Sequence, residues 1–159
     1  MRLPALLIRR YLTGLAIAAA VVTLDLWTKR YASLHFGNDP IEVVRGFFGF
    51  TYIENPGGAF GSFPGGGVVI GVAALIITGV VLVAMARARP ALETVALGLV
   101  LGGAIGNLVD RFARGAGIID GSVIDWIELW IIPTFNLADA TVTVAVALLL
   151  IQTWRTRYT

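Results

Sequence analysis

Two aspartates in the second half of the chain have the residue type and spacing that could do chemistry. Asp125 lies in the stretch VIDW over residues 123–126, and Asp139 ends the stretch FNLAD over residues 135–139. An apolar run begins near Leu137, so both carboxylates lie at the mouth of a possible membrane span. Because an ionisable side chain at membrane depth is costly, each aspartate is a candidate functional residue.

Two carboxyl groups held close together cannot both ionise easily, so they share one proton near neutral pH. One group can then deprotonate a water molecule while the other protonates a carbonyl oxygen, as in aspartic proteases. A simpler interpretation is that Asp125 is a solvated loop residue and Asp139 caps a helix. The two residues alone leave both interpretations open.

The composition predicts a membrane protein. Of the 159 residues, 57% are hydrophobic and 14% are charged, and the mean hydropathy is +0.84. A soluble domain carries roughly 25% charged residues. Apolar runs of ~20 residues suit helices that cross a bilayer. We therefore predict a single, mainly α membrane domain over residues 1–159, with spans at about 12–28, 68–85, 92–110 and 137–154. The first run resembles a secretory signal peptide in outline, but its length indicates a retained span.

The distribution of arginine predicts the orientation in the membrane. Four spans place both termini on one side, and most of the arginines lie at that side. The positive-inside rule then puts both termini in the cytoplasm and residues 30–66 and 112–135 outside it. The arginines on the predicted cytoplasmic side are Arg2, Arg9, Arg10, Arg87, Arg89, Arg155 and Arg157.

Other classes of function find little support in the composition. The net charge of +2 does not indicate a nucleic-acid partner, because the basic residues lie at span ends. The chain has no cysteine, and His35 is its single histidine. We therefore expect no disulfide and no metal site built on cysteine or histidine.

The two outer segments have different patterns. Residues 41–53 are rich in β-prone side chains and are flanked by turn residues, which predicts a small extracytoplasmic β-sheet. Residues 126–132 are very apolar, and we expect them to form a loop that dips into the membrane interface and carries Asp125 toward the helices.

The third span carries glycines at four-residue spacing, at Gly98, Gly102 and Gly106, which predicts a close-packed helix face. Asn107 lies on the same face as these glycines, and Asp110 and Arg111 follow it at i+3 and i+4. An ion pair between Asp110 and Arg111 would be a purely structural alternative. The same holds for Asp25 and Lys29, which are four residues apart.

Taken in order, several motifs resemble those of the bacterial lipoprotein signal peptidase, or signal peptidase II, family. The resemblance covers most of the chain. It rests on Asp25 with Lys29, GFF at 46–48, NPGGAFG at 55–61, GGAIGNLVDR at 102–111, VIDW at 123–126 and FNLAD at 135–139. Trp126 replaces a smaller aromatic residue, and Gly58 replaces a commoner alanine.

The resemblance implies a multi-pass aspartic endopeptidase of the bacterial inner membrane, active near the extracytoplasmic face. Such enzymes remove signal peptides from diacylglyceryl-modified prolipoproteins, cutting just before the lipidated cysteine, and need no cofactor. The implied partners are this lipid-modified substrate and membrane lipid, and we expect a monomer. By resemblance, Asp125 and Asp139 are catalytic, Asn55, Asn107, Arg111 and Asn136 bind substrate, and Asp25 and Gly58 support the site.

Two alternatives from other classes remain. One is a small proton- or ion-coupled transporter in which Asp125 and Asp139 relay the ion. Four spans without a visible repeat, and carboxylates at only one interface, argue against a path across the membrane. The other is a membrane scaffold, which would not need polar side chains facing a glycine-packed interior.

Overall fold

The computed structural model describes residues 3–57, 66–87 and 90–158, and within them it contains four long helices. These are α1 (Leu3–His35), α2 (Gly67–Met85), α3 (Ala91–Ala113) and α4 (Leu137–Tyr158). All four are long and apolar enough to cross a membrane. The fold class predicted from hydropathy is therefore confirmed.

Helix α1 is longer than the apolar run at 12–28 that marks it in the sequence. It spans 33 residues and continues to His35, through a stretch that we expected to lie outside the membrane. Asp25 and Lys29 are buried within it, so the charges that suggested the end of the span instead lie inside the fold.

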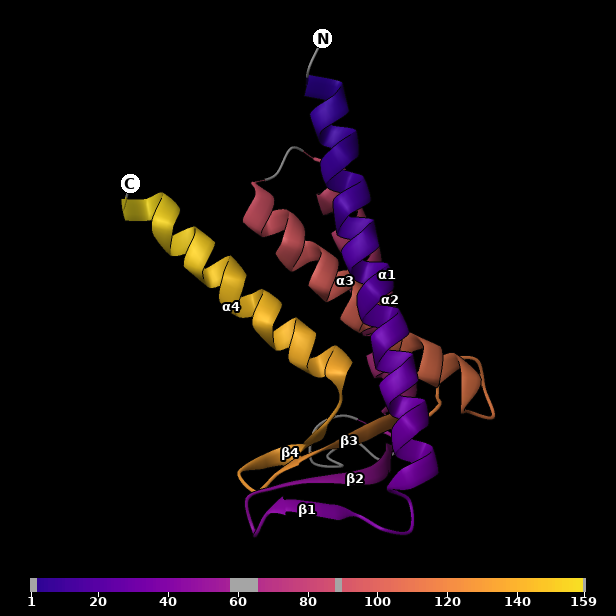
Figure 1. Cartoon of the computed structure of the whole chain (residues 1–159). Helices are drawn as coiled ribbons and strands as arrows, with labels where there is room; N and C mark the ends of the chain where they lie inside the picture. The colour runs from indigo at the N-terminus through magenta and orange to yellow at the C-terminus, as the bar shows by residue number, and fades with distance from the viewer. Residues whose placement is uncertain (1–2, 58–65, 88–89, 159) are drawn as a thin grey trace.

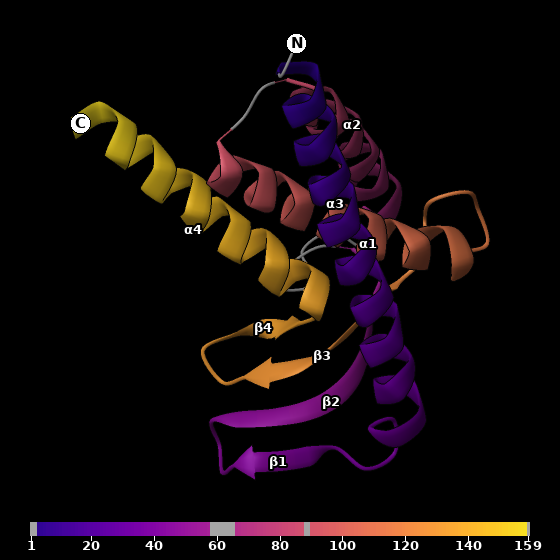
Figure 2. The ribbon, with the colours of Figure 1, turned by 45° about the horizontal axis from the view of Figure 1, so that its top comes forward.

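The second component is a four-stranded antiparallel sheet at one end of the helices (Figure 1). Its strands are β1 (Ile41–Val44), β2 (Phe48–Asn55), β3 (Val123–Leu129) and β4 (Ile132–Phe135), in that spatial order. Figure 2 shows the same arrangement from a second direction, with the two termini at the end away from the sheet.

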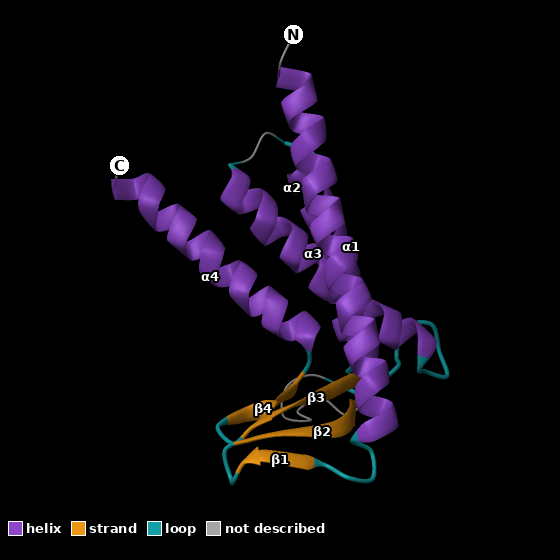
Figure 3. Cartoon of the chain, in the orientation of Figure 1, coloured by secondary structure: helices purple, strands orange, loops and turns teal. Residues whose placement is uncertain are grey.

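The prediction of an apolar loop over residues 126–132 is wrong. These residues belong to β3, β4 and the turn between them (Figure 3). Strand β3 pairs with β2, with Asp125 opposite Ile53 and Val123 opposite Asn55. Sheet pairing satisfies backbone N–H and C=O groups that an apolar loop would leave without partners. The two halves of the sheet come from segments separated by two helices, which local sequence patterns do not reveal.

Helix α3 lies at the centre of the helical part, in contact with the other three helices. A Cβ on Gly102 would lie 2.6 Å from Val21 Cβ of α1, and a Cβ on Gly103 would lie 2.6 Å from the Ala138 backbone oxygen of α4. The glycines therefore let α1 and α4 approach α3 closely, as the four-residue spacing predicts.

Candidate active site

Asp125 lies in β3 and is buried, with 4% of its surface exposed. Its Oδ2 accepts a hydrogen bond from Asn55 Nδ2 at 2.9 Å, and its Oδ1 accepts one from Asn136 Nδ2 at 2.7 Å. Burial raises the pKa of Asp125 to about 6 from its ordinary value of 3.8. The hydrogen bond from Asn55 lowers this pKa, and the nearby charge of Asp139 raises it.

Asp139 lies in the first turn of α4 and takes part in a reciprocal cap. Asn136 Oδ1 accepts from the Asp139 backbone N–H at 3.0 Å, and Asp139 Oδ2 accepts from the Asn136 backbone N–H at 3.3 Å. This is the arrangement of a capping box, in which two free N–H groups are satisfied together. The other oxygen of Asp139 accepts from Asn107 Nδ2 at 2.9 Å. The capping interpretation therefore holds for Asp139, and its contact with Asn107 also joins it to the polar network.

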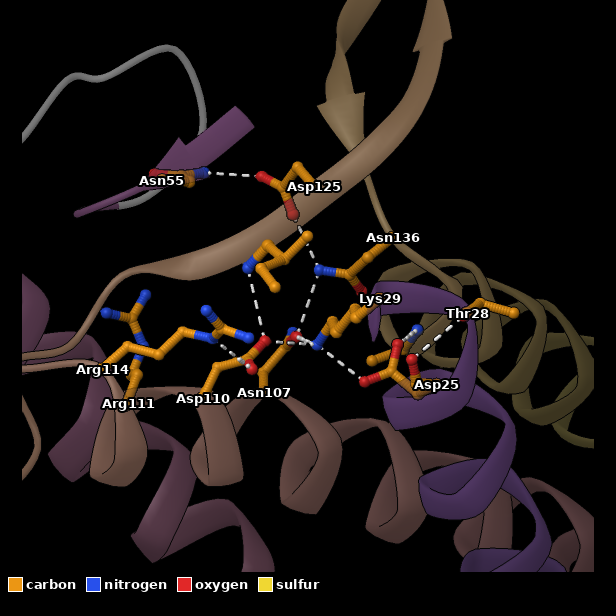
Figure 4. A network of polar contacts seen from close by, with 12 residues as sticks. Asp25, Thr28, Lys29, Asn55, Asn107, Asp110, Arg111, Arg114, Asp125 and Asn136 are labelled. Atoms are coloured by element: carbon orange, nitrogen blue, oxygen red, sulfur yellow. Dashed lines mark hydrogen bonds and ion pairs between the residues drawn. The ribbon is translucent and has the colours of Figure 1, made fainter. Parts of the chain in front are cut away.

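Two asparagines connect the two carboxylates. Asn136 Nδ2 donates to Asp125 Oδ1 and also to Asn107 Oδ1, at 3.1 Å. Asn107 Nδ2 in turn donates to Asp139 Oδ1. A continuous path of hydrogen bonds therefore runs from Asp125 through the two amides to Asp139. Figure 4 shows Asp125, Asn136 and Asn107 of this path, with Asn55 bound to the other oxygen of Asp125. Residues that lie fourteen positions apart in the sequence thus meet in one hydrogen-bonded network.

A buried lysine lies beside this network. Lys29 Nζ is 2.6 Å from Asp25 Oδ2 and 2.9 Å from Asp110 Oδ2, and it donates to Asn107 Oδ1 at 2.9 Å. The pair between Asp25 and Lys29, four residues apart, is present as the structural alternative expected. Asp110, however, pairs with Lys29 and with Arg114 at 3.1 Å. The sequence did not indicate the connection of Lys29 to Asn107 and Asp110, because it depends on how α1 lies against α3.

Two further candidate residues, Arg111 and Gly58, are not members of the path that joins the two aspartates. Arg111 is 4% exposed, and its guanidinium donates to the Gly121 backbone oxygen at 3.1 Å. It therefore holds the loop that leads into β3. The substrate contact that the resemblance implies for Arg111 stays a prediction. Gly58, which the resemblance marks as a supporting residue, lies outside the described residues.

Aromatic side chains fasten the sheet to the end of α1. The Phe50 ring stacks on Phe36 with centroids 5.6 Å apart, and it lies 5.7 Å from the Trp126 ring. Phe36 directly follows α1, and Phe50 and Trp126 belong to neighbouring strands β2 and β3. Trp126 therefore helps to set the position of β3, the strand that carries Asp125.

The fold and the site together define a multi-pass membrane protein with two aspartates joined through amide side chains where its helices meet a small sheet. Residues 17–155 match the family model described as signal peptidase (SPase) II. The chain belongs to the signal peptidase II family and is a membrane peptidase. The resemblance inferred from the motifs is confirmed, and the transporter and scaffold alternatives lose their support.

Known relatives and solved structures are similar to this protein over most of the chain. The lipoprotein signal peptidase of Symbiobacterium thermophilum is 37% identical over 142 residues, covering 87% of this chain and 92% of the relative. That of Syntrophus aciditrophicus is 37% identical over 150 residues, covering 87% and 89%. Two solved bacterial membrane enzymes are each 28% identical, with TM-scores of 0.78 and 0.75. The first match covers 92% of this chain and 90% of the solved chain, and the second covers 89% and 92%.

Proposed function

We propose that this peptidase is an aspartic endopeptidase that cuts prolipoproteins just before a diacylglyceryl-modified cysteine, with Asp125 and Asp139 as the catalytic pair. The observation that carries the proposal is the path of hydrogen bonds from Asp125 through Asn136 and Asn107 to Asp139. It supports a pair of carboxyl groups that are held in a fixed relation and act together.

In the proposed mechanism, the pair begins with one proton, on Asp125. The raised pKa of Asp125 supports this assignment, because burial favours its neutral form. The Asp139 carboxylate takes a proton from water as the water oxygen bonds to the scissile carbonyl carbon, while Asp125 gives its proton to the carbonyl oxygen. Asp139 then protonates the leaving amide nitrogen, the C–N bond breaks, and Asp125 recovers its proton from the diol.

Three asparagines hold the pair in this geometry and line the site. Asn55 and Asn136 donate to Asp125, and Asn107 donates to Asp139. Donors that stabilise a carboxylate lower its tendency to bind a proton, which opposes the effect of burial at Asp125. We assign to Asn55, Asn107 and Asn136 the polar contacts with the substrate backbone, and to Arg111 the support of the loop before β3.

The lipid on the substrate explains why the site lies on membrane-spanning helices. A diacylglyceryl chain stays in the bilayer, so its peptide must reach the carboxylates from the side of the helices. Large apolar side chains are exposed on these helices, among them Val80, Val83 and Leu150, which are 62% to 66% exposed. We propose that the acyl chains lie along this apolar surface and that the protein acts as a monomer without a cofactor.

The test of the substrate class compares two precursors that differ only in lipidation. Purified enzyme in detergent should cut a precursor with a diacylglyceryl-modified cysteine and leave the unmodified precursor intact, because the lipid holds the peptide at the site. A gel-shift assay measures cleavage, and mass spectrometry should find the lipidated cysteine as the new N-terminus. Equal cleavage of both precursors, or a cut at another bond, contradicts the proposal.

We also propose that both termini face the cytoplasm and that the sheet and the two aspartates lie at the extracytoplasmic side. Both termini lie at the end of the helices away from the sheet (Figure 1), and arginines concentrate at that end. Reporter fusions after Arg89 and after Thr159 should report the cytoplasm, whereas a fusion at Arg114 should report the outer side. The opposite pattern of reporter activity would reject this orientation.

A further inference from the structure

Lys29 is the centre of a buried cluster of charges that the proposed mechanism does not use. It is 1% exposed, Asp25 is 0% exposed and Asp110 is 3% exposed. The ammonium has three N–H donors, and three oxygens lie within 2.9 Å of it, from Asp25, Asp110 and Asn107. The lysine is therefore fully coordinated by groups from α1 and α3.

Each carboxylate of this cluster also holds one backbone N–H of a different element. Asp25 Oδ1 accepts from the Ala138 backbone N–H of α4 at 2.9 Å. Asp110 Oδ2 accepts from the Ile124 backbone N–H of β3 at 3.3 Å. Ala138 directly precedes Asp139, and Ile124 directly precedes Asp125. The two carboxylates bound to Lys29 thus hold the residues next to the two aspartates of the candidate site.

A third connection reaches the site through a side chain. The Asn107 oxygen accepts from Lys29, so the amide nitrogen of Asn107 faces Asp139, to which it donates. Reversing the amide would turn its NH₂ group toward the ammonium and its oxygen toward the carboxylate, and both contacts would be repulsive. Lys29 therefore favours the orientation of Asn107 that supplies a donor to Asp139.

Stability is a weak explanation for such a cluster. Removing charges from water is costly, and replacing a buried ion pair by apolar residues of similar volume is often neutral or stabilising. Geometry is a better explanation, since a displacement of about 1 Å in a catalytic group can cost about a hundredfold in rate. Ala138 and Ile124 are both 0% exposed, so the cluster acts on a part of the backbone that water does not reach.

We propose that Lys29, together with Asp25 and Asp110, is a positioning device that sets the separation and orientation of Asp125 and Asp139. The proposal rests on the proposed function of these two aspartates and adds three residues that act through them. Asp25 positions α4, Asp110 positions β3, and Lys29 holds the two carboxylates at a fixed distance from one another and from Asn107.

The first test uses a double variant that keeps the charge balanced. Lys29→Met alone leaves the buried Asp25 carboxylate without its cation, while Asp110 keeps Arg114, and the variant is expected to fold poorly. Lys29→Met combined with Asp25→Asn removes one charge of each sign, while the asparagine oxygen can still accept from Ala138. We expect kcat on the lipidated precursor to fall about a hundredfold, with KM within about twofold of the wild type.

A second variant keeps the pair between Lys29 and Asp25. Asp110→Asn removes the charge that holds β3. Arg114, which also pairs with Asp110, stays solvated in this variant because its side chain is 34% exposed. We expect a fall in kcat of about tenfold with KM unchanged. The matched control is Arg30→Met, which removes one positive charge from the exposed residue beside Lys29 and should leave both constants unchanged.

The readouts separate a positioning role from a structural one. Melting temperature and the amount of enzyme that binds an uncleavable lipidated peptide measure folding, and kcat is expressed per folded enzyme. A double variant and an Asp110→Asn variant with wild-type kcat per folded enzyme would overturn the proposal, whatever their stability. A rise in KM at constant kcat would also overturn it.

The same assays distinguish this inference from the proposed function. If Asp125→Asn or Asp139→Asn keeps full activity, the proposed catalytic pair is wrong. If those variants are inactive while the cluster variants keep wild-type kcat, the pair stands and the positioning role of Lys29 fails.

Discussion

Asp125→Asn and Asp139→Asn should each lower kcat on a lipidated precursor by about 10⁴-fold or more, with expression and membrane insertion retained. Asparagine preserves the size of each side chain and one acceptor oxygen but cannot exchange the proton. The double variant should cost little more than either single one, because residues that act as a unit are strongly non-additive. A gel-shift assay with the wild type, both single variants and the double variant measures this.

The capping role of Asp139 predicts a different outcome. Asparagine is also a good N-cap residue, so Asp139→Asn would be nearly silent if capping were its only role. Substantial processing by either single variant would refute the aspartic mechanism for this protein.

The stability of Asp125→Asn provides an independent control for folding. The pKa of Asp125 in the folded protein, about 6, is above its ordinary value of 3.8, so the folded state binds the proton more tightly. Proton binding at Asp125 therefore stabilises the folded wild type fully below about pH 4, and this stabilisation is lost as the pH rises through about 6. The difference in stability between these two pH limits is about 3 kcal/mol. Asp125→Asn has no charge to bury, so it should melt higher than the wild type near pH 8 and similarly near pH 4. A variant that melts lower than the wild type near pH 8 would contradict the burial of an ionised Asp125.

Gly106→Leu should abolish both activity and stable folding. A Cβ on Gly106 would lie 2.6 Å from Asp25 Oδ2, so a side chain there pushes α1 away from α3 and displaces Asp25. The displacement strains a packed helix contact and disturbs a buried ion cluster, which together cost several kcal/mol. Melting temperature in detergent and cleavage of the lipidated precursor are the two measurements.

The matched control for this variant is Gly79→Leu in α2. Nothing lies within 4 Å of a Cβ built on Gly79, and this residue is exposed on its helix. The same change there should leave activity and melting temperature close to those of the wild type. If Gly106→Leu is as active and as stable as Gly79→Leu, the contact between α1 and α3 is placed wrongly.

Hydropathy and short motifs were enough to predict the four spans, the strands within residues 41–53 and the two aspartates as candidates. Each of these features is local. A span is a run of apolar residues, a strand of the sheet is a run of β-prone residues between turns, and a capping residue such as Asn136 directly precedes its helix. The motifs also identified the family, which the comparison with known proteins confirmed.

The length of α1 was not predictable in the same way. Asp25 and Lys29 are charged, so a hydropathy profile places the end of the span near them. In the fold, each finds an opposite charge or a backbone N–H within 2.9 Å, and the helix continues to His35. Local composition cannot show that a charge is neutralised by a residue on another helix.

Only the tertiary structure decided which polar groups meet. Asp125 binds Asn55, seventy positions away in the sequence, because β3 pairs with β2 across two intervening helices. Asp110 forms its ion pair with Lys29 of α1 rather than with its neighbour Arg111, because the glycines of α3 let α1 approach α3 at that point. The sequence by itself determined the spans and the chemistry available to this protein. The crossing of the helices and the pairing of the strands, which depend on contacts between distant segments, decided how that chemistry is assembled.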